Sequence, residues 1–195
     1  MKLLKKTQFK AYNWLNFESL PESDGYKFEL YSKLDIDVTE ITILFYSLFK
    51  KFIDDLQVGQ FGINSEWGDF CIDTWDLHND RYNYSPEGKS NSTAAYLTML
   101  IENEIGPDYN GFCRSLNWDK FLPIVLDCIL NHMASYSIMI YAPKHDFVFY
   151  FHHTGSIGIF YKELNDGVKH IIERAKIEDL DIRNANDERV MVQIG

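Results

Sequence analysis

The sequence predicts an α+β protein, in which a mainly antiparallel β-sheet is packed with about four α-helices. The first observation is residues 136–161, where three β-rich runs follow one another with only two short turn clusters between them. Connections this short pair strands antiparallel, because a parallel partner needs a long crossover. The second observation is that segments with the 3.6-residue period of an amphipathic helix lie on both sides of this C-terminal meander.

The three runs of the meander are apolar on both faces. In the middle run, Phe147, Phe149 and Phe151 share one face of the strand, because successive side chains point to opposite sides. Apolar residues on both faces are typical of a sheet that is covered on both sides. We therefore expect the three phenylalanines in the core, and we expect Gly158 in the third run to allow close packing on its face.

The segment before the meander begins with a strand and a helix. Residues 26–30 alternate apolar and charged side chains, which predicts a strand with one solvent-facing side. Asp37 and Glu40 have the spacing of a capping box, so a helix is expected to start there. Its apolar face continues to Leu56, and Gly59 is expected to end it.

The middle of the chain is predicted to hold a strand, a loop and two helices. Residues 69–75 alternate in the manner of a strand, and residues 78–91 are polar and rich in turn-forming residues, as in a surface loop. A helix capped by Asn91 or Ser92 is expected to follow. Residues 117–134 are apolar nearly all round, which indicates a buried helix.

The end of the chain is predicted to form a helix, a loop and a strand. Residues 164–175 carry apolar side chains at helical spacing, residues 179–188 are charged, and residues 189–194 alternate as a last strand would. The sequence contains no internal repeat and no linker-like stretch. We therefore expect one globular domain over residues 1–195.

Composition limits the classes of function. The formal net charge is −10, which argues against nucleic-acid binding, because that binding depends on neutralising phosphates with Lys and Arg. The three cysteines form no Cys-x-x-Cys pair, no secretory signal begins the chain, and no apolar stretch is long enough for a membrane span. We expect a soluble cytoplasmic protein with no membrane association. An acidic chain suits a basic partner.

The chemistry-bearing residues do not form a recognisable catalytic or metal-binding pattern. His152 and His153 are adjacent, but neighbouring side chains of a strand point to opposite faces, and zinc needs three or four placed ligands. Ser156 follows Gly155 but lacks the strand-to-helix setting of a nucleophile elbow. Cys113 is the only cysteine with a cationic neighbour. We therefore expect no catalytic residue, no metal and no cofactor.

Residues 66–84 are the most suggestive surface of the chain, since acids and large aromatic residues alternate along them. Tyrosine and tryptophan supply contact area at low entropic cost, and flanking acids select basic partners. An exposed tryptophan in this segment is expected to anchor the partner. The predicted partner-binding residues are Glu66, Trp67, Asp69, Asp73, Trp75, Asp76 and Asp80.

Three functions remain open on the sequence. The first is a non-enzymatic protein-binding module that engages a basic partner through the acidic aromatic segment, for which an inhibitor or immunity-type role against a basic toxin would suit the charge. The second is a hydrolase whose site combines His152 and His153 with the Asp73–Asp80 segment. The third is an assembly subunit whose excess of aromatic residues forms a self-interface. The sequence indicates no oligomeric state.

Overall fold

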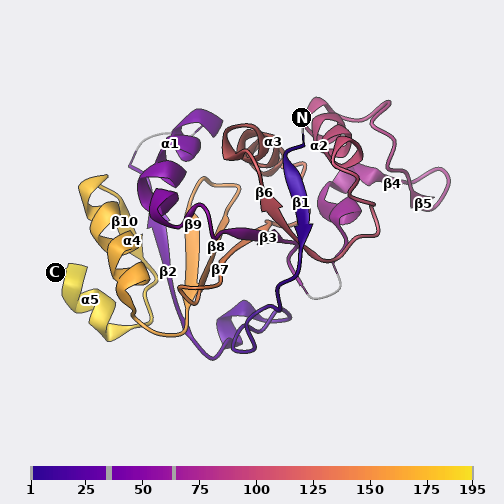
Figure 1. Cartoon of the computed structure of the whole chain (residues 1–195). Helices are drawn as coiled ribbons and strands as arrows, with labels where there is room; N and C mark the ends of the chain where they lie inside the picture. The colour runs from indigo at the N-terminus through magenta and orange to yellow at the C-terminus, as the bar shows by residue number, and fades with distance from the viewer. Residues whose placement is uncertain (1, 34–36, 63–64, 195) are drawn as a thin grey trace.

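The computed structural model describes residues 2–33, 37–62 and 65–194. Within these residues, five α-helices and an eight-stranded antiparallel sheet form a mixed architecture (Figure 1), which confirms the predicted α+β class. In spatial order the strands of the sheet are β1 (Leu4–Thr7), β6 (Phe112–Ser115), β3 (Gln57–Gly59), β7 (Met139–Ala142), β8 (Phe147–Phe151), β9 (Ile157–Tyr161), β2 (Tyr26–Tyr31) and β10 (Asp181–Arg183). The helices are α1 (Val38–Phe49), α2 (Asn91–Glu102), α3 (Trp118–Leu130), α4 (Asp166–Ile177) and α5 (Glu188–Ile194).

The predicted meander forms the centre of the sheet. Strands β7, β8 and β9 pair antiparallel in sequence order, and Phe149 lies opposite Ile140 on one side and Ile159 on the other. The side chains of Phe147, Phe149 and Phe151 are fully buried, as predicted. The short turns and the double-sided apolar pattern therefore specified this part of the fold.

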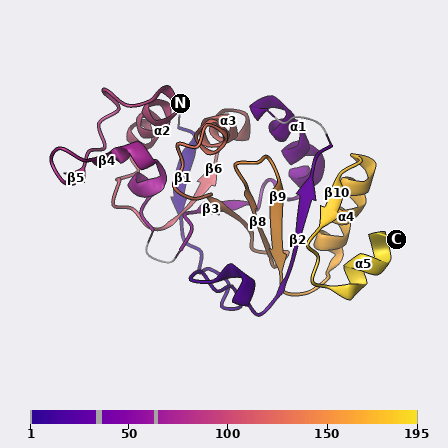
Figure 2. The same cartoon turned by 180° about the vertical axis from the view of Figure 1, so that it is seen from behind.

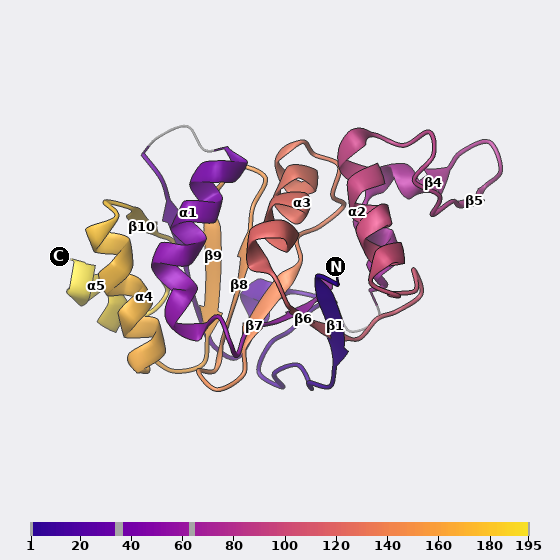
Figure 3. The same cartoon turned by 45° about the horizontal axis from the view of Figure 1, so that its top comes forward.

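One face of the sheet is covered by helices, with α1 between α3 and α4 (Figure 3). The core under them is largely aromatic, and the ring of Phe49 stacks on Phe149 with 3.8 Å between centroids and 4° between ring planes. Helix α1 begins as predicted, because the Asp37 carboxylate accepts a hydrogen bond of 2.8 Å from the backbone N–H of Glu40. In the described residues, no helix is long and apolar enough to span a lipid bilayer.

The opposite face of the sheet is covered by the chain that leads from β1 to β2. Trp14 and Leu15 from this segment form a second buried cluster with Tyr141, Val148 and Phe160 of the meander. The two layers of aromatic side chains explain why both faces of the meander are apolar. A Cβ atom on Gly158 would lie too close to the ring of Tyr150, so this ring would have to move, and the expectation of close packing at this glycine is confirmed.

Residues 69–75 were predicted as a strand, and this is wrong. The chain instead forms two short 3-10 turns at Trp67–Phe70 and Ile72–Thr74, followed by the two residues of β4 (Trp75–Asp76), which pair with β5 (Arg81–Tyr82). Backbone N–H groups of this stretch bond to distant loops, for example from Gly68 to the carbonyl of Pro107 at 2.8 Å. These long-range hydrogen bonds replace the ladder that an alternating pattern would suggest.

Two further boundaries differ from the prediction. Helix α1 ends at Phe49 and a 3-10 turn follows at Lys50–Phe52, so Leu56 and Gly59 belong to the approach and end of strand β3. Residues 189–194 are part of helix α5, whereas the last strand, β10, lies within the segment predicted as a charged loop. A short alternating run is ambiguous between strand and helix, because six residues cover too few periods to separate them.

Candidate functional site

The acidic aromatic segment of residues 66–84 divides into a buried part and an exposed part. Trp67 belongs to the buried part, with no exposed surface, and its indole N–H donates to the carbonyl of Gly111 at 2.9 Å. Tyr96 donates its hydroxyl proton to the carbonyl of Trp67 at 2.9 Å. Trp67 is therefore a core residue, and its predicted place on the partner-binding surface is wrong.

Asp69 and Asp73 face other parts of the chain. The carboxylate of Asp69 accepts from the hydroxyl of Tyr84 at 3.0 Å. The carboxylate of Asp73 accepts from the hydroxyl of Thr93 at 2.5 Å and from the backbone N–H of Ser90 at 3.1 Å, at the start of helix α2. Burial works to raise the pKa of Asp73, but these hydrogen bonds outweigh it and hold the pKa below its usual value. Asp73 therefore has a structural role at a helix start.

The exposed part of the segment is the hairpin of β4 and β5, which projects from one end of the molecule in two opposite views (Figures 1 and 2). Four large apolar side chains are exposed on and beside it, with exposed fractions of 39% to 85%: Ile72, Trp75, Leu77 and Tyr82. The rings of Trp75 and Tyr82 meet edge to face at 4.9 Å, and Tyr82 stacks on Tyr84 at 5.6 Å. The hairpin thus displays a packed row of aromatic rings.

The turn of the hairpin is organised by Asp76. Its carboxylate accepts hydrogen bonds from the backbone N–H groups of His78 and Asn79, at 3.0 and 3.2 Å, and from the side-chain amide of Asn79. The bond from the Asn79 amide is the main cause that lowers the pKa of Asp76. Asp80 is exposed and has a φ of 50°, a conformation that Asp and Asn adopt more readily than most residues.

The acids of this segment are not neutralised by ion pairs among the described residues. Within the described residues, no ion pair involves Glu66, Asp69, Asp73, Asp76 or Asp80. Arg81 is the only lysine or arginine between residues 66 and 84. The hairpin and its base therefore carry an excess of negative charge beside exposed aromatic rings, which is the combination that a basic protein surface complements.

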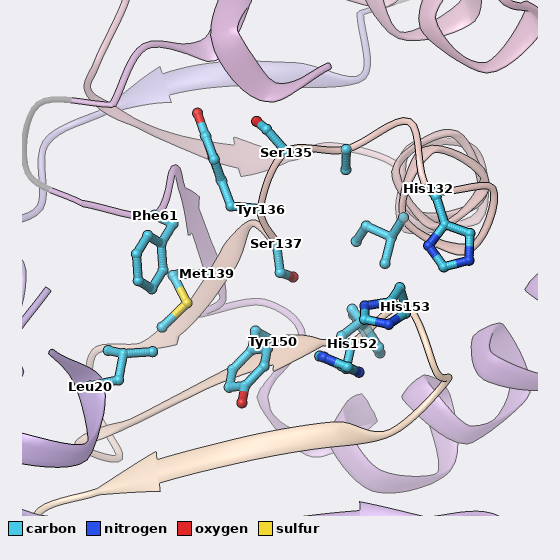
Figure 4. A pocket seen from close by; sticks show the side chains of 13 residues that line it. Leu20, Phe61, His132, Ser135, Tyr136, Ser137, Met139, Tyr150, His152 and His153 are labelled. Carbon is cyan, nitrogen blue, oxygen red and sulfur yellow. The ribbon is translucent and has the colours of Figure 1, made fainter. Parts of the chain in front are cut away.

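A cavity of about 490 Å³ lies beside the end of β8 and contains both predicted histidines. His152 and His153 come from the turn after β8, and His132 comes from the end of helix α3 (Figure 4). The ring centroids of His152 and His153 are 4.0 Å apart, and those of His132 and His153 are 5.0 Å apart. The sequence did not indicate His132, because it lies twenty residues before the pair.

The histidine cavity is separate from the Asp73–Asp80 segment. Among the described residues that line it, none is acidic, so the Asp73–Asp80 segment does not join His152 and His153 as the alternative function required. The Nδ1 atom of His152 accepts a hydrogen bond of 3.3 Å from the backbone N–H of Thr154, so this ring nitrogen takes part in the hydrogen bonding of the turn. Burial, and then the charge of His153, lower the pKa of His152, which favours the neutral ring.

The other nucleophile candidates are enclosed. Cys113 has no exposed surface, and burial raises the pKa of its thiol to about 12, so the reactive thiolate is disfavoured. Ser156 is 3% exposed and lies in the turn into β9 rather than at a strand-to-helix elbow. Neither residue has the exposed, activated geometry of a nucleophile.

Metal binding gives a first test of this site. No group of three or more His, Cys, Asp or Glu in the described ranges is placed to hold a metal ion. We therefore expect the purified protein to contain no stoichiometric zinc, iron or nickel by elemental analysis, and its thermal midpoint to be unchanged by a strong chelator. Stoichiometric metal that is lost on substituting His132 or His153 would contradict this expectation.

Comparison of the chain with protein-family models, with curated proteins and with solved structures gave no match.

Proposed function

We propose that this protein binds a basic protein partner through the hairpin surface, defined here as Ile72, Trp75, Leu77, Tyr82 and the neighbouring acids Asp76 and Asp80. The observation that carries the proposal is the exposure of three large apolar side chains, Trp75, Leu77 and Tyr82, on the hairpin, with a fourth, Ile72, in the turn just before it. The hairpin itself projects from one end of the molecule (Figure 2). Single exposed apolar residues are ordinary, but a contiguous group rimmed by charged residues is typical of a protein–protein interface.

The charge of the surface favours a basic partner. The acids of residues 66–84 have no ion-pair partners among the described residues, and the whole chain carries a formal charge of −10. Such a field steers a basic protein toward the hairpin and speeds the encounter. We propose that the biological role of the protein is that of an inhibitor or immunity-type protein that acts against a basic toxin, such as a nuclease.

The same charge disfavours the self-interface of an assembly subunit. Two hairpin surfaces that face each other across a two-fold axis would bring like charges together, which is costly at an interface. The hydrolase that combines His152 and His153 with the Asp73–Asp80 segment is disfavoured, because no residue of that segment is among the described residues that line the histidine cavity. The protein-binding function therefore has the strongest support of the three.

Charge neutralisation tests the electrostatic part of the proposal. Glu66→Gln with Asp80→Asn removes two acids that form no ion pair among the described residues, and asparagine accepts the positive φ at position 80. We expect this double variant to associate more slowly with a partner captured from extracts of the source cells, and we expect the rate to depend less on salt. Asp73 and Asp76 are unsuitable for this test, because Asp73 bonds to the start of helix α2 and Asp76 organises the turn of the hairpin.

The matched control removes two exposed acids elsewhere, Glu18→Gln with Glu173→Gln, and so changes the net charge equally. Association measured on a biosensor at two salt concentrations should be slowed by the hairpin variant and much less by the control. Equal association rates for wild type and the hairpin variant would exclude the proposed role of these acids.

Truncation of the exposed tryptophan tests the apolar part. Trp75→Ala should weaken binding of the same partner by about 2 kcal/mol or more, because aromatic anchors at the centre of an interface carry much of its energy. Leu116→Ala is the control, since Leu116 is 55% exposed and lies outside the hairpin. An unchanged dissociation constant for Trp75→Ala, with the fold intact by circular dichroism, would show that Trp75 is not an anchor and would contradict the hairpin as the binding site.

A further inference from the structure

The histidine cavity has two ends of different character. The three histidine rings lie together at one end, and Leu20, Phe61 and Met139 lie at the other (Figure 4). Met139 is fully buried in the second core cluster, and the half-buried Leu20 and Phe61 pack against that cluster. The three histidines are exposed. A ligand in this cavity would therefore meet polar groups toward the solvent and apolar groups toward the core.

The histidine end offers hydrogen-bond donors. The Nδ1 atom of His152 accepts from the backbone N–H of Thr154, so the neutral ring carries its proton on Nε2. In the part of the chain that the structure describes, neither this Nε2–H group nor a ring nitrogen of His132 or His153 has a hydrogen-bond partner. Each of the three rings therefore has an N–H group available to an acceptor on a ligand.

The charges around the cavity suit a ligand with one negative charge. None of the described lining residues is an acid, a lysine or an arginine. Burial raises the pKa of Tyr136 and Tyr150, so these two lining hydroxyls stay protonated. Glu29 and Lys27 of strand β2 act on the charge of His152, but they form an ion pair with each other. A dianion such as a phosphate monoester would find no fixed cation in the described lining to balance its second charge.

We propose that the histidine cavity binds a small amphiphilic carboxylate, whose anionic head accepts hydrogen bonds from the histidines and whose apolar body lies against Leu20, Phe61 and Met139. The cavity volume of about 490 Å³ is within the range of small-molecule sites. Burial of the apolar body stabilises the complex, and charge-assisted hydrogen bonds fix the orientation of the head. The cavity shares no residue with the hairpin surface, so the two proposals are independent.

Binding of the anion should be accompanied by proton uptake. Burial, and then the charge of His153, hold the pKa of His152 below its usual value, so the free cavity favours a neutral ring. A bound carboxylate raises the histidine pKa in the complex, because an opposite charge favours the protonated ring. Affinity should therefore increase as the pH falls from about 8 to about 6, by at most about tenfold per pH unit for each proton taken up. An alkyl carboxylic acid stays ionised over this range, because a carboxyl group of this kind has a pKa of about 4.3.

Four probes separate the contribution of the head from that of the body. Octanoate has both the anionic head and the apolar body, octanol has a neutral head, octylamine has a cationic head, and acetate lacks the body. We expect saturable binding of octanoate by calorimetry at about pH 6, about tenfold or more tighter than that of octanol. Octylamine and acetate should show no detectable binding.

Two variants test the histidines. His153→Gln keeps an N–H donor but cannot take up a proton, so it should weaken octanoate binding at about pH 6, reduce its pH dependence and leave octanol binding unchanged. His132→Asn should act in the same way, and asparagine accepts the φ of 56° at this position. His78→Gln is the matched control, because His78 is exposed and does not line the cavity. Circular dichroism verifies the fold of each variant.

Proton NMR of the histidine rings locates the ligand. Octanoate should shift the ring signals of the three cavity histidines and raise the pH midpoints of their titrations. The signals of His145 and His170, which lie outside the cavity, should stay unchanged. Three results would each overturn the proposal: no octanoate binding at millimolar concentration, equal affinity for octanoate and octanol at about pH 6, or the same pH dependence in wild type and His153→Gln. Octanoate shifts confined to histidines outside the cavity would overturn it as well.

Discussion

Replacing Phe149 with alanine is expected to lower the free energy of unfolding by about 3–5 kcal/mol, the range for a large aromatic deletion in a packed core. Phe149 is fully buried on the central strand of the meander. Its ring stacks on Phe49 of helix α1 at 3.8 Å and meets Phe151 edge to face at 5.9 Å. The deletion therefore removes the closest ring stack between the sheet and helix α1, while Phe49 keeps a longer contact with Phe147 at 6.4 Å.

Urea unfolding followed by circular dichroism measures this effect. Ile177→Ala is the matched control, because Ile177 is a large aliphatic residue that is 68% exposed at the end of helix α4. The control should leave the stability within about 0.5 kcal/mol of wild type. A near-wild-type unfolding curve for Phe149→Ala would mean that the neighbouring side chains repack to fill the cavity, and that the stacked pair of Phe49 and Phe149 is not essential for stability.

The sequence predicted the meander well because its signals are local. The middle strand alternates Phe147, Phe149 and Phe151 with Val148 and Tyr150, and the turns around it are short. Connections this short allow only antiparallel pairing, because a parallel partner needs a long crossover.

The start of helix α1 was equally local, since Asp37 accepts from the N–H group of Glu40, three residues on. The cap predicted for helix α2 was wrong, because the helix is capped by Ser90 and not by Asn91 or Ser92.

The errors occurred where distant segments decide the structure. Trp67 and Trp75 stand in the same acidic and aromatic surroundings, so no local signal separates a core residue from an exposed one. Their difference comes from residues 107–111, which bond to the backbone and indole of Trp67 and enclose it. The place of His132 beside His153 in the cavity is likewise a product of the fold.

The second large effect on stability is expected from substitution of Asp187, whose hydrogen bonds connect the start of helix α5 to the sheet. The side chain is 3% exposed. One carboxylate oxygen accepts from the backbone N–H and the Nε of Arg189, at 3.0 and 2.9 Å. The other accepts from the Nη2 of Arg189 at 2.8 Å and from the hydroxyl of Tyr161 on β9 at 3.0 Å. Each oxygen of this carboxylate thus accepts two hydrogen bonds.

Asp187→Ala is expected to cost about 1.5–3 kcal/mol of stability near neutral pH, the range for hydrogen bonds to a charged group. Tyr161 would be left with a buried hydroxyl and no acceptor, whereas the guanidinium of Arg189 is exposed and would return to water. The control is Asp24→Ala, which removes a solvent-exposed ion pair with Lys162 and should change stability little.

The pH dependence identifies the charge as the cause. Hydrogen bonds from Arg189 are the main cause that holds the pKa of Asp187 below its usual value, so the folded state binds a proton less readily than the unfolded chain. The stabilisation is therefore fully present above the unfolded pKa of about 3.9, and it is lost as the pH falls through the lower folded pKa. The stability difference between wild type and Asp187→Ala, measured by urea unfolding, should narrow below about pH 4. A difference that stays constant down to about pH 2 would mean that packing of Asp187, and not its charge, holds helix α5 in place.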